Sequence, residues 1–480
     1  MSQVLPVLGL LNLFLAGTMI FPLVVSWHYG EKEIGAFLLS MGITALAGLL
    51  LYVSGPKRRG DITRRQAFLI VTFGWISASI FGALPFYVSG AFAHPVDALF
   101  ETVSGFTTTG SSVLMSDAID LFPKGLHFWR AMIQWLGGMG IILLSIAILP
   151  FLGVGGMQLY RAEVPGPFLD KLRPRIAETA KILWQTYLLI TGLEVVMLLL
   201  GGMTLFDALC HSFTTMATGG FSTRGASIGF YGHYHRIVIV FFMFLAGVNF
   251  ALHYRFLKGG YKGYWLDREF RFYLRLILVA IGLMFGYLFF VIGGGWGQRL
   301  EDAAFQVVSI MTTTGYATTD FGRWPAFCQY LLVLLMFVGG SAGSTGGGIK
   351  CIRVMLLYKY ARQELGRIIH PHAVTSVKLG EQTISPSVLN GILGMVILYM
   401  GIFILASMAM SFFGLDIITS ISSVAATLGN IGPGLGLVGP TEHYGHIHTV
   451  GKGILIFCML AGRLEVYTIV ILLFHEFWRK

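Results

Sequence analysis

The stretch DALFETVSGFTTTGSS, residues 97–112, turns polar directly after a long apolar segment and ends on a Thr-Thr-Gly followed by two serines. Its pattern occurs four times in the chain, each time with an Asp, a Thr eleven residues later and a Gly thirteen residues later. The four acids are Asp97, Asp207, Asp302 and Asp416. The four tripeptides are Thr108-Thr109-Gly110, Thr218-Gly219-Gly220, Thr313-Thr314-Gly315 and Thr427-Leu428-Gly429. A pattern repeated at similar intervals predicts four equivalent pieces of one structure.

Chance alone does not explain the spacing, although it contributes. About 0.1 matches are expected at random, and five occur. The fifth runs from Asp61 to Thr72 and Gly74, but it passes through Arg64 and Arg65 into a long apolar segment, so we treat it as a coincidence. The other four matches each lie between two apolar segments, and this shared position makes the repeat convincing.

The composition places the chain in a membrane. Of its 480 residues, 55% are hydrophobic and only 12% are charged, against roughly 25% charged in soluble domains. Such a chain is expected to be an all-α protein that crosses the bilayer many times. The four cysteines show no CxxC spacing, which argues against a zinc site and against a disulfide framework.

Apolar segments of about 20 residues, the length that spans a bilayer, follow one another along the chain. We predict ten spans, at residues 4–27, 34–53, 67–88, 128–151, 182–203, 237–257, 273–292, 327–357, 388–413 and 450–474. They form a leading pair and four units of span, polar stretch and span. The expected boundaries are 1–60 for the leading pair and 61–165, 166–262, 263–365 and 366–480 for the units.

The basic residues predict the orientation. The linkers 55–66, 160–181, 255–275 and 350–378, with the tail 479–480, hold 24 of the 33 Lys and Arg. By the positive-inside rule these linkers and both termini lie in the cytoplasm, so the four Asp-Thr-Gly stretches lie on the outer side. Topology and contact with anionic lipid account for the net charge of +10 without a nucleic-acid partner.

The repeated stretch has the features of a pore loop. About ten helix-compatible residues follow each acid, too few to span, so each stretch is predicted to be a half-helix that turns back. Non-helical backbone at this depth is tolerated where it lines a water-filled cavity or is buried in protein. The acid offsets the positive end of the helix dipole, and the Gly lets carbonyls face an ion. Carbonyl rings with Thr hydroxyls can replace the water shell of a cation. The alternative is that these small and hydroxyl residues only mediate helix–helix contacts.

Four such units in one chain, each with a single filter Gly, resemble the Trk/Ktr/HKT superfamily of potassium transporters. The two leading spans resemble its bacterial TrkH/TrkG branch. Further matching motifs are QWLGGMG at 134–140, TGGFST at 218–223 and GRLE at 462–465. The resemblance implies one pseudo-fourfold pore in a multi-pass protein of the bacterial inner membrane, taking up K⁺ with no bound cofactor. It also implies that two pore chains pair and that a cytosolic nucleotide-binding TrkA-type subunit regulates them.

The resemblance assigns the filter to the four tripeptides together with Asn430. Only the Thr-x-Gly core of the potassium-channel filter TVGYG is kept. The middle residue varies among Thr109, Gly219, Thr314 and Leu428. We therefore expect fewer or looser ion sites than in a potassium channel, with weaker discrimination against other cations.

Residues 339–348, GGSAGSTGGG, cannot form a stable helix because each Gly costs about 1 kcal/mol relative to Ala. This run should break the eighth predicted span, and by resemblance it is the gating loop of the superfamily. The charge of Arg463 falls within an apolar segment, where a lone charge is costly and needs a partner. We predict that Arg463 binds carbonyls of the run and that Gly346, Gly347, Gly348, Lys350 and Arg463 form a gate. The alternatives are a packing hinge for the run and a structural ion pair for the Arg.

Two other functions are weighed against a passive pore. One is a symporter that couples K⁺ to H⁺ or Na⁺, although Glu194 and Arg463 are the charges that stand out within spans. The other is an intramembrane hydrolase that uses Ser341, because Gly339-x-Ser341-x-Gly343 has the nucleophile-elbow spacing. That motif needs a strand–turn–helix setting, which the sequence does not predict. We therefore expect a transport protein and no enzyme, with K⁺ at the filter as its metal.

Overall fold

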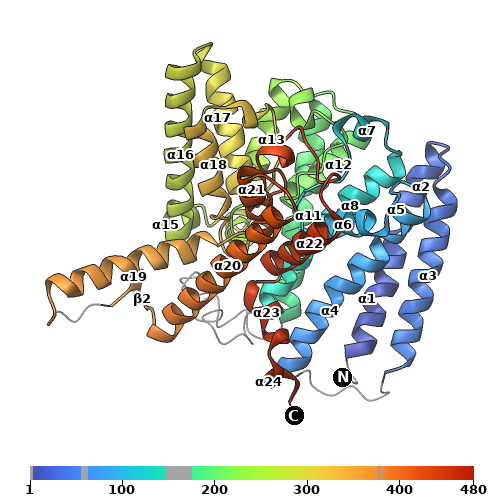
Figure 1. Cartoon of the computed structure of the whole chain (residues 1–480), viewed down its shortest axis with the longest axis horizontal. Coiled ribbons are helices and arrows are strands. Elements are labelled where there is room, and N and C mark those ends of the chain that lie inside the picture. Colours follow the sequence, from blue (N-terminus) through green and yellow to red (C-terminus); the bar gives the residue numbers. More distant parts are fainter. Residues whose placement is uncertain (1–3, 56–62, 148–175, 373–375, 381, 480) are drawn as a thin grey trace.

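The computed structural model describes residues 4–55, 63–147, 176–372, 376–380 and 382–479, and these are mostly helical (Figure 1). Their one sheet is a two-stranded antiparallel ribbon of β1 (Lys378–Leu379) and β2 (Gln382–Thr383). The all-α prediction is confirmed. The end of the predicted span 128–151 and most of the basic linker 160–181 lie outside the described residues.

Long apolar helices dominate the described part of the chain, where six are long and apolar enough to cross a membrane. They are α1 (Val4–Thr18) continued by α2 (Ile20–His28), α3 (Ile34–Val53), α4 (Arg64–Gly82) continued by α5 (Leu84–Val88), α11 (Ile176–Leu200), α16 (Arg268–Ile292) and α20 (Pro386–Phe412). Two bent helix pairs raise the number to as many as eight. The helices α8 (Lys124–Ala147) and α18 (Ala326–Met336) lie at two further predicted spans, and the total of ten stays a prediction.

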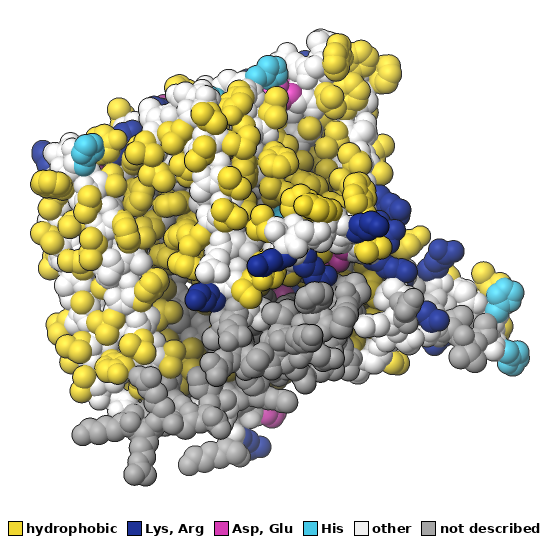
Figure 2. Space-filling model, turned by 180° about the vertical axis from the view of Figure 1, so that it is seen from behind, with side chains coloured by type: hydrophobic (Ala, Val, Ile, Leu, Met, Phe, Trp, Pro, Cys, Tyr) yellow, Lys and Arg dark blue, Asp and Glu magenta, His cyan; other side chains and the backbone are white. Residues whose placement is uncertain are grey.

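The outer surface of these helices is apolar. Phe290 at the end of α16 and Phe412 at the end of α20 are both 85% exposed. Figure 2 shows hydrophobic side chains over most of one face, with Lys and Arg gathered lower down toward the arm formed by α19 (Cys351–Ile369). Apolar surface of this extent is stable against lipid and not against water, so the chain is a multi-pass membrane protein.

Four short helices lie inside the bundle, each in contact with a long helix before it and a helix after it. They are α6 (Pro95–Phe106), α12 (Leu205–Met216), α17 (Trp296–Met311) and α21 (Ile417–Leu428). α6 contacts α4 and α8, α12 contacts α11 and α13, α17 contacts α16 and α18, and α21 contacts α20 and α22. A long helix, a short helix and a further helix therefore follow one another four times among the described residues, while the predicted repeat of two spans per unit and the unit boundaries stay predictions.

Two predicted spans are not straight. α13 (His233–Ala246) and α14 (Phe250–Leu257) meet at 103° within the predicted span 237–257. α22 (Thr449–Arg463) meets the segment of α23 (Val466–Val470) and η4 (Ile471–Leu473) at 118° within the span 450–474. Apolarity predicts where a span lies, but it carries no information on these breaks. At the break between α13 and α14 backbone groups bond to the glycine-rich run in place of the helix: the Phe250 N–H donates to the Gly343 carbonyl (3.1 Å) and the Ser341 N–H donates to the Gly247 carbonyl (2.8 Å).

The break at the glycine-rich run is confirmed. α18 ends at Met336 and α19 begins at Cys351, with irregular backbone between them that includes left-handed Gly343 and Gly348. A methyl group on Gly339 would lie 1.8 Å from the carbonyl oxygen of Gly347. The run folds back on itself so tightly that a side chain at Gly339 has no room.

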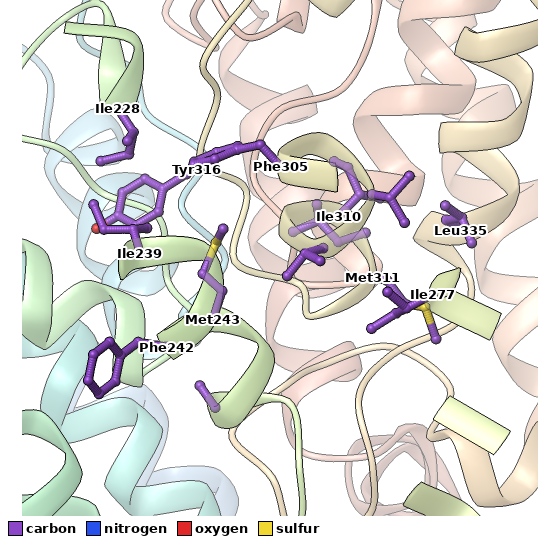
Figure 3. Packing of buried hydrophobic residues seen from close by; sticks show 14 of the residues in the cluster. Ile228, Ile239, Phe242, Met243, Ile277, Phe305, Ile310, Met311, Tyr316 and Leu335 are labelled. Carbon is purple, nitrogen blue, oxygen red and sulfur yellow. The ribbon is translucent and has the colours of Figure 1, made fainter. Parts of the chain in front are cut away.

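Hydrophobic packing holds the short helices in place. Figure 3 shows Ile310 and Met311 at the end of α17, with Ile277 of α16 and Leu335 of α18 on one side. On the other side lie Tyr316, Ile239 and Met243, the last two from α13. A second cluster surrounds α6 and α21 in the same way. Because a close-packed interior has little compressibility, the helix ends are held in defined positions.

The remaining helices are short connections: α7 (Ser116–Leu121), η1 (Ser227–Phe230), α15 (Gly263–Leu266), η2 (Phe321–Arg323), η3 (Gly436–Val438) and α24 (His475–Trp478). Leu472 and Phe477 pack against Val4 and Leu8, so the first turn of α1 and the end of the chain lie at one end of the molecule (Figure 1). This arrangement agrees with termini on one side of the membrane, and the identity of that side stays a prediction.

Candidate functional site

Each of the four short helices is followed by the same strained turn. The second residue past the helix end has a left-handed backbone in every case: Thr108 (φ 51°), Thr218 (φ 55°), Thr313 (φ 61°) and Asn430 (φ 55°). Two residues later a glycine also has positive φ: Gly110, Gly220, Gly315 and Gly432. A β-branched Thr is rarely found in this region, and such strain costs of order 1–3 kcal/mol and clusters at functional sites.

The fourth turn lies three residues later than the Asp spacing predicted. Thr427 and Leu428 are the last residues of α21, and the Thr427 hydroxyl donates to the Ser423 carbonyl within that helix (2.7 Å). The turn that matches the other three is Asn430-Ile431-Gly432. The predicted fourth tripeptide, Thr427-Leu428-Gly429, is therefore out of register.

The error in register comes from the acids. Asp97 and Asp207 are the third residues of α6 and α12, whereas Asp416 precedes α21 as its N-cap and accepts from Thr419 N (3.1 Å). A bond from the Thr419 side chain holds the pKa of Asp416 below its usual value. Asp302 is not near the start of α17 either, because that helix begins at Trp296. An acid is favourable at several positions near a helix start, so it is a poor marker of register.

One backbone hydrogen bond recurs in all four turns. The residue after the left-handed one donates its N–H to a carbonyl in the last turn of the helix. The four bonds are Thr109 to Ser104 (2.8 Å), Gly219 to Thr214 (2.8 Å), Thr314 to Ser309 (2.9 Å) and Ile431 to Ala426 (2.8 Å). The four turns thus have one backbone conformation in spite of different side chains.

The four turns close into a ring. A methyl group built on Gly110 would lie 2.2 Å from the Gly219 carbonyl oxygen in the next turn. A methyl group on Gly220 would lie 2.0 Å from the Thr314 carbonyl oxygen. One on Gly315 would lie 1.8 Å from the Ile431 carbonyl oxygen, and one on Gly432 would lie 2.7 Å from that of Thr109. Since the fourth contact returns to the first turn, the loops surround one common axis. No side chain fits at any of the four glycines.

The ring faces a cavity of about 80 Å³. All four ring glycines line it, together with the segments that leave the ring, including Ser111, Ser222, Pro433 and Glu442. A single depression floored by four backbone turns is the geometry expected of the mouth of a pore.

Three buried polar side chains that the sequence did not single out hold the segments that leave the ring. Glu101, His211 and Gln306 each lie seven residues before a left-handed residue and bond to the segment that leaves the ring. Their partners are Ser112 (3.0 Å), Ser222 (3.1 Å) and Thr318 (3.2 Å). The signal was a large polar side chain seven residues before the left-handed residue in three of the four half-helices.

Gln134 of α8 supports the second turn. Its amide nitrogen donates to the Gly219 carbonyl (2.7 Å), and its amide oxygen accepts from the Phe221 N–H (3.2 Å). Gln134 opens the QWLGGMG motif, so this motif holds the backbone of a neighbouring turn.

Glu101 and Arg130 form a buried ion pair beside the first and second turns, with side chains 0% and 2% exposed. Arg130 Nε donates to Glu101 Oε1 (2.8 Å), and the guanidinium lies 4.1 Å from the centroid of the Phe221 ring. Glu101 Oε2 accepts from the Val113 N–H (3.0 Å). The pair therefore links the segment after the first turn to the segment after the second.

The glycine-rich run lies directly against the ring. The Gly347 N–H donates to the hydroxyl of left-handed Thr313 (2.7 Å). A methyl group on Gly347 would lie 2.6 Å from the Gly429 carbonyl oxygen and 2.8 Å from Asn430 Cβ. The Thr345 hydroxyl donates to the Met216 carbonyl at the end of α12 (3.0 Å). The run thus contacts the second, third and fourth turns or their helix ends.

Arg463 is the last residue of α22 and is buried. Its Nη1 donates to the Thr345 carbonyl (2.7 Å) and its Nη2 to the Gly137 carbonyl (3.3 Å). The predicted bond between Arg463 and a carbonyl of the run is present. Lys350 Nζ donates to the Gly346 carbonyl, and Glu465 pairs with Arg353.

The other predicted sites have less support. The Ser341 hydroxyl is buried without a hydrogen-bond partner among the described residues, so no base is bonded to it there. The described residues hold no group of three or more His, Cys, Asp or Glu that could bind a metal ion.

The comparison with protein families decides the identity of the chain. Residues 35–479 match the model of the TrkH family, described as a cation transport protein. The chain belongs to the TrkH family. TrkH relatives extend over its whole length: the Trk system potassium uptake protein TrkH of Salmonella typhimurium is 43% identical over 479 residues, which is 99% of this chain and 98% of that protein. The Trk system potassium uptake protein TrkG of Escherichia coli is 35% identical over 474 residues, 96% of both chains.

A solved TrkH structure has the same fold. The crystal structure of the potassium transporter TrkH from Vibrio parahaemolyticus matches with a TM-score of 0.92 and 37% identity, covering 100% of this chain and 99% of that one. The family expected from the sequence is therefore confirmed.

The buried pair Glu101–Arg130 gives a test of what holds this TrkH-family ring in place. Glu101→Leu leaves an unpaired buried charge and should cost about 3–5 kcal/mol of unfolding free energy, and Arg130→Met should cost a similar amount. The double variant should lose clearly less than the sum, because no charge stays unpaired. The measurement is unfolding in detergent, and additive losses would contradict the pairing.

Proposed function

We propose that this chain takes up K⁺ across the bacterial inner membrane through the ring of four turns, and that the glycine-rich run closes this path from the inner side. The observation that carries the proposal is the closed ring, in which each glycine lies against a carbonyl of the next turn. The ion is inferred from its relatives, which are the Trk system potassium uptake proteins TrkH and TrkG.

The ring has the chemistry of a cation filter. Four helices end at it, and each directs the negative end of its dipole toward the axis. Backbone carbonyls and Thr hydroxyls are the ligands that replace the water shell of K⁺ in filters. The Thr108 hydroxyl is fully buried and bonds to no group among the described residues, as expected of a group that meets an ion or a water. The filter residues are then Thr108–Gly110, Thr218–Gly220, Thr313–Gly315 and, in the corrected register, Asn430-Ile431-Gly432.

The run and its two cations form the gate. Gly346 lies against the Thr312 carbonyl, and Gly347 lies against Gly429 and Asn430, whereas Gly348 lies against Gly339 within the run. Arg463 donates to the Thr345 carbonyl and Lys350 to the Gly346 carbonyl. A guanidinium and an ammonium beside the path add an electrostatic barrier to a cation, and withdrawal of the run removes its backbone from the path.

The proposal also covers the surroundings of the chain. The basic segment 255–275 follows α14, and Lys258, Lys262, Arg268 and Arg275 are exposed on it. This face suits anionic lipid and a cytosolic TrkA-type subunit that binds nucleotides, and both termini lie on this side. Pairing of two such chains follows from the family resemblance.

A coupled symporter is the second candidate, and one observation favours it. Glu194 on α11 is fully buried, and neither oxygen of its carboxyl group has a hydrogen-bond partner among the described residues. An acid of this kind inside a span is the usual place for a coupled proton.

Ion flux into proteoliposomes separates the two candidates. We expect uptake of K⁺ and radioactive rubidium that follows the K⁺ gradient and the membrane potential alone. Uptake that requires a Na⁺ or pH gradient, and that Glu194→Gln uncouples, would instead establish the symporter. A chain that takes up no K⁺ under any gradient would contradict both.

The corrected register predicts which residue of the fourth unit governs selectivity. Asn430→Ala should lower the preference for K⁺ over Na⁺ at least severalfold, because the amide of Asn430 bonds to Thr109 Oγ1 (3.0 Å) in the ring. Thr427→Val is the matched control and should change the preference less than twofold, because its hydroxyl bonds only within α21. Competition of Na⁺ with rubidium uptake measures both. The reverse ranking would restore the tripeptide 427–429 as the filter.

Arg463→Ala should raise K⁺ flux in the absence of a regulator by about tenfold or more, because charge-assisted hydrogen bonds of about 1.5–3 kcal/mol each hold the run in place. Arg463→Lys should give a smaller rise, since it keeps the charge with fewer donors. Arg299→Ala is the control: Arg299 also donates to a carbonyl, that of Gly293 (2.7 Å), but it makes no contact with the run. Unchanged flux at normal expression would contradict the gate.

A further inference from the structure

Glu269 is a buried carboxylate that the proposed pathway does not use. It is the second residue of α16, two residues after the N-cap Asp267, and it is 4% exposed. A carboxylate buried to this degree needs partners that compensate for its lost hydration. Its partners identify its role.

Both partners are backbone N–H groups at the base of the glycine-rich run. Glu269 Oε1 accepts from the Ala342 N–H (2.8 Å) and from the Ile352 N–H (3.0 Å). Ala342 is the fourth residue of the run and precedes Gly346–Gly348, and Ile352 lies four residues after the end of the run. One carboxylate oxygen thus joins the two ends of the segment that carries Gly346, Gly347 and Gly348.

Glu269 also supplies a cap that α19 lacks. Ile352 is the second residue of α19, and the N-cap of that helix, Lys350, makes no side-chain capping bond. A carboxylate at a helix N-terminus satisfies an orphan N–H and interacts favourably with the helix dipole. Because the cap comes from α16, the start of α19 is tied to a different helix.

The base of the run has a second set of attachments at the break between α13 and α14. The Ser341 N–H donates to the Gly247 carbonyl (2.8 Å), and the Phe250 N–H donates to the Gly343 carbonyl (3.1 Å). Each of these bonds holds one point of the run, whereas the single Oε1 of Glu269 accepts from two N–H groups, one on either side of Gly346–Gly348. Removal of Glu269 therefore frees the base more than removal of any single one of these bonds.

We propose that Glu269 is the positioning residue of the gate: its carboxyl group clamps the backbone before and after Gly346–Gly348 and so sets the closed position of the gate. The inference rests on the proposed gate and adds to it a tether at the base, three residues before and seven residues after Thr345, whose carbonyl Arg463 holds. α16 is joined to the run through this carboxylate, so a shift of its first turn is transmitted to the gate.

The test uses the full chain in proteoliposomes without a regulator. Glu269→Ala should raise K⁺ flux about tenfold, and Glu269→Gln should raise it less, because the amide oxygen still accepts hydrogen bonds from the two N–H groups. The preference for K⁺ over Na⁺ should stay unchanged in both variants, since the ring keeps its own supports. A general loss of structure would change the preference as well.

Asp267→Asn is the matched control. It neutralises an acid two residues earlier in the same helical turn, whose Oδ1 accepts from the Phe270 N–H (2.6 Å) and makes no contact with the run. Asn is itself a favourable N-cap, so α16 keeps its start. Its flux should stay within about twofold of the wild type.

A second measurement reports on the run without any ion flux. Cys351 is fully buried at the start of α19, and its thiol donates to the Gly339 carbonyl (3.2 Å). In a chain whose Cys210, Cys328 and Cys458 are replaced by Ala, Glu269→Ala should speed the labelling of Cys351 by a thiol reagent about tenfold. Asp267→Asn should leave the labelling rate unchanged.

The outcomes separate the clamp from the gate. If Arg463→Ala raises flux while Glu269→Ala and Glu269→Gln change neither flux nor labelling, the gate stands and the clamp is overturned. Lower flux with a changed ion preference would mean a purely structural role and would also overturn it. If no variant alters flux and the labelling rate is constant, the gate itself fails and the clamp with it. Combined with Arg463→Ala, the effect of Glu269→Ala should shrink, because the run is already released.

Discussion

The structure depends on the close approach of four glycines to four carbonyls. Each ring glycine lies where even a methyl group would collide with the backbone of the next turn. This approach is possible only if the four turns are held to within a fraction of an ångström. The rest of the fold meets that demand: each short helix packs between two others, and each turn forms the same backbone hydrogen bond to its helix. The strain of Thr108, Thr218 and Thr313 is then an imposed conformation that the surrounding structure stabilises.

The family, the membrane class and the approximate place of the four turns can be predicted from the sequence. They depend on apolarity and on residues that are required for an unusual backbone conformation. A glycine with a left-handed backbone is one such residue. The register of the fourth turn is not readable from its acid, since Asp416 is favourable as an N-cap while Asp97 is favourable inside the first turn. The bends after Ala246 and Arg463 are not readable either. At the first bend the freed backbone bonds to the glycine-rich run, and such contacts depend on tertiary structure.

The buried charges share one function, which is to hold irregular backbone. Arg463 donates to carbonyls at Thr345 and Gly137, Glu269 accepts from N–H groups at Ala342 and Ile352, and Glu101 accepts from Val113 while paired with Arg130. Inside a membrane protein each unsatisfied backbone group costs several kcal/mol, because no lipid can bond to it. A turn or a glycine run exposes several such groups at once. A charged side chain bonds to more than one of them, and its own burial is compensated by the same bonds.

The fourth unit departs from the other three at the residue where the ring and the run meet. Its left-handed residue is Asn430, which adopts this conformation more readily than Thr and whose amide has two donors where a hydroxyl has one. Those donors reach Thr109 in the ring and the Met459 carbonyl on α22 (2.9 Å). Gly347 of the run and Gly462, next to Arg463, both lie against the same side chain. A movement of α22 or of the run therefore displaces Asn430 and, through it, the first turn. Under the proposed function, selection and closure are mechanically coupled at this residue, and a Thr there would keep the turn but lose the link.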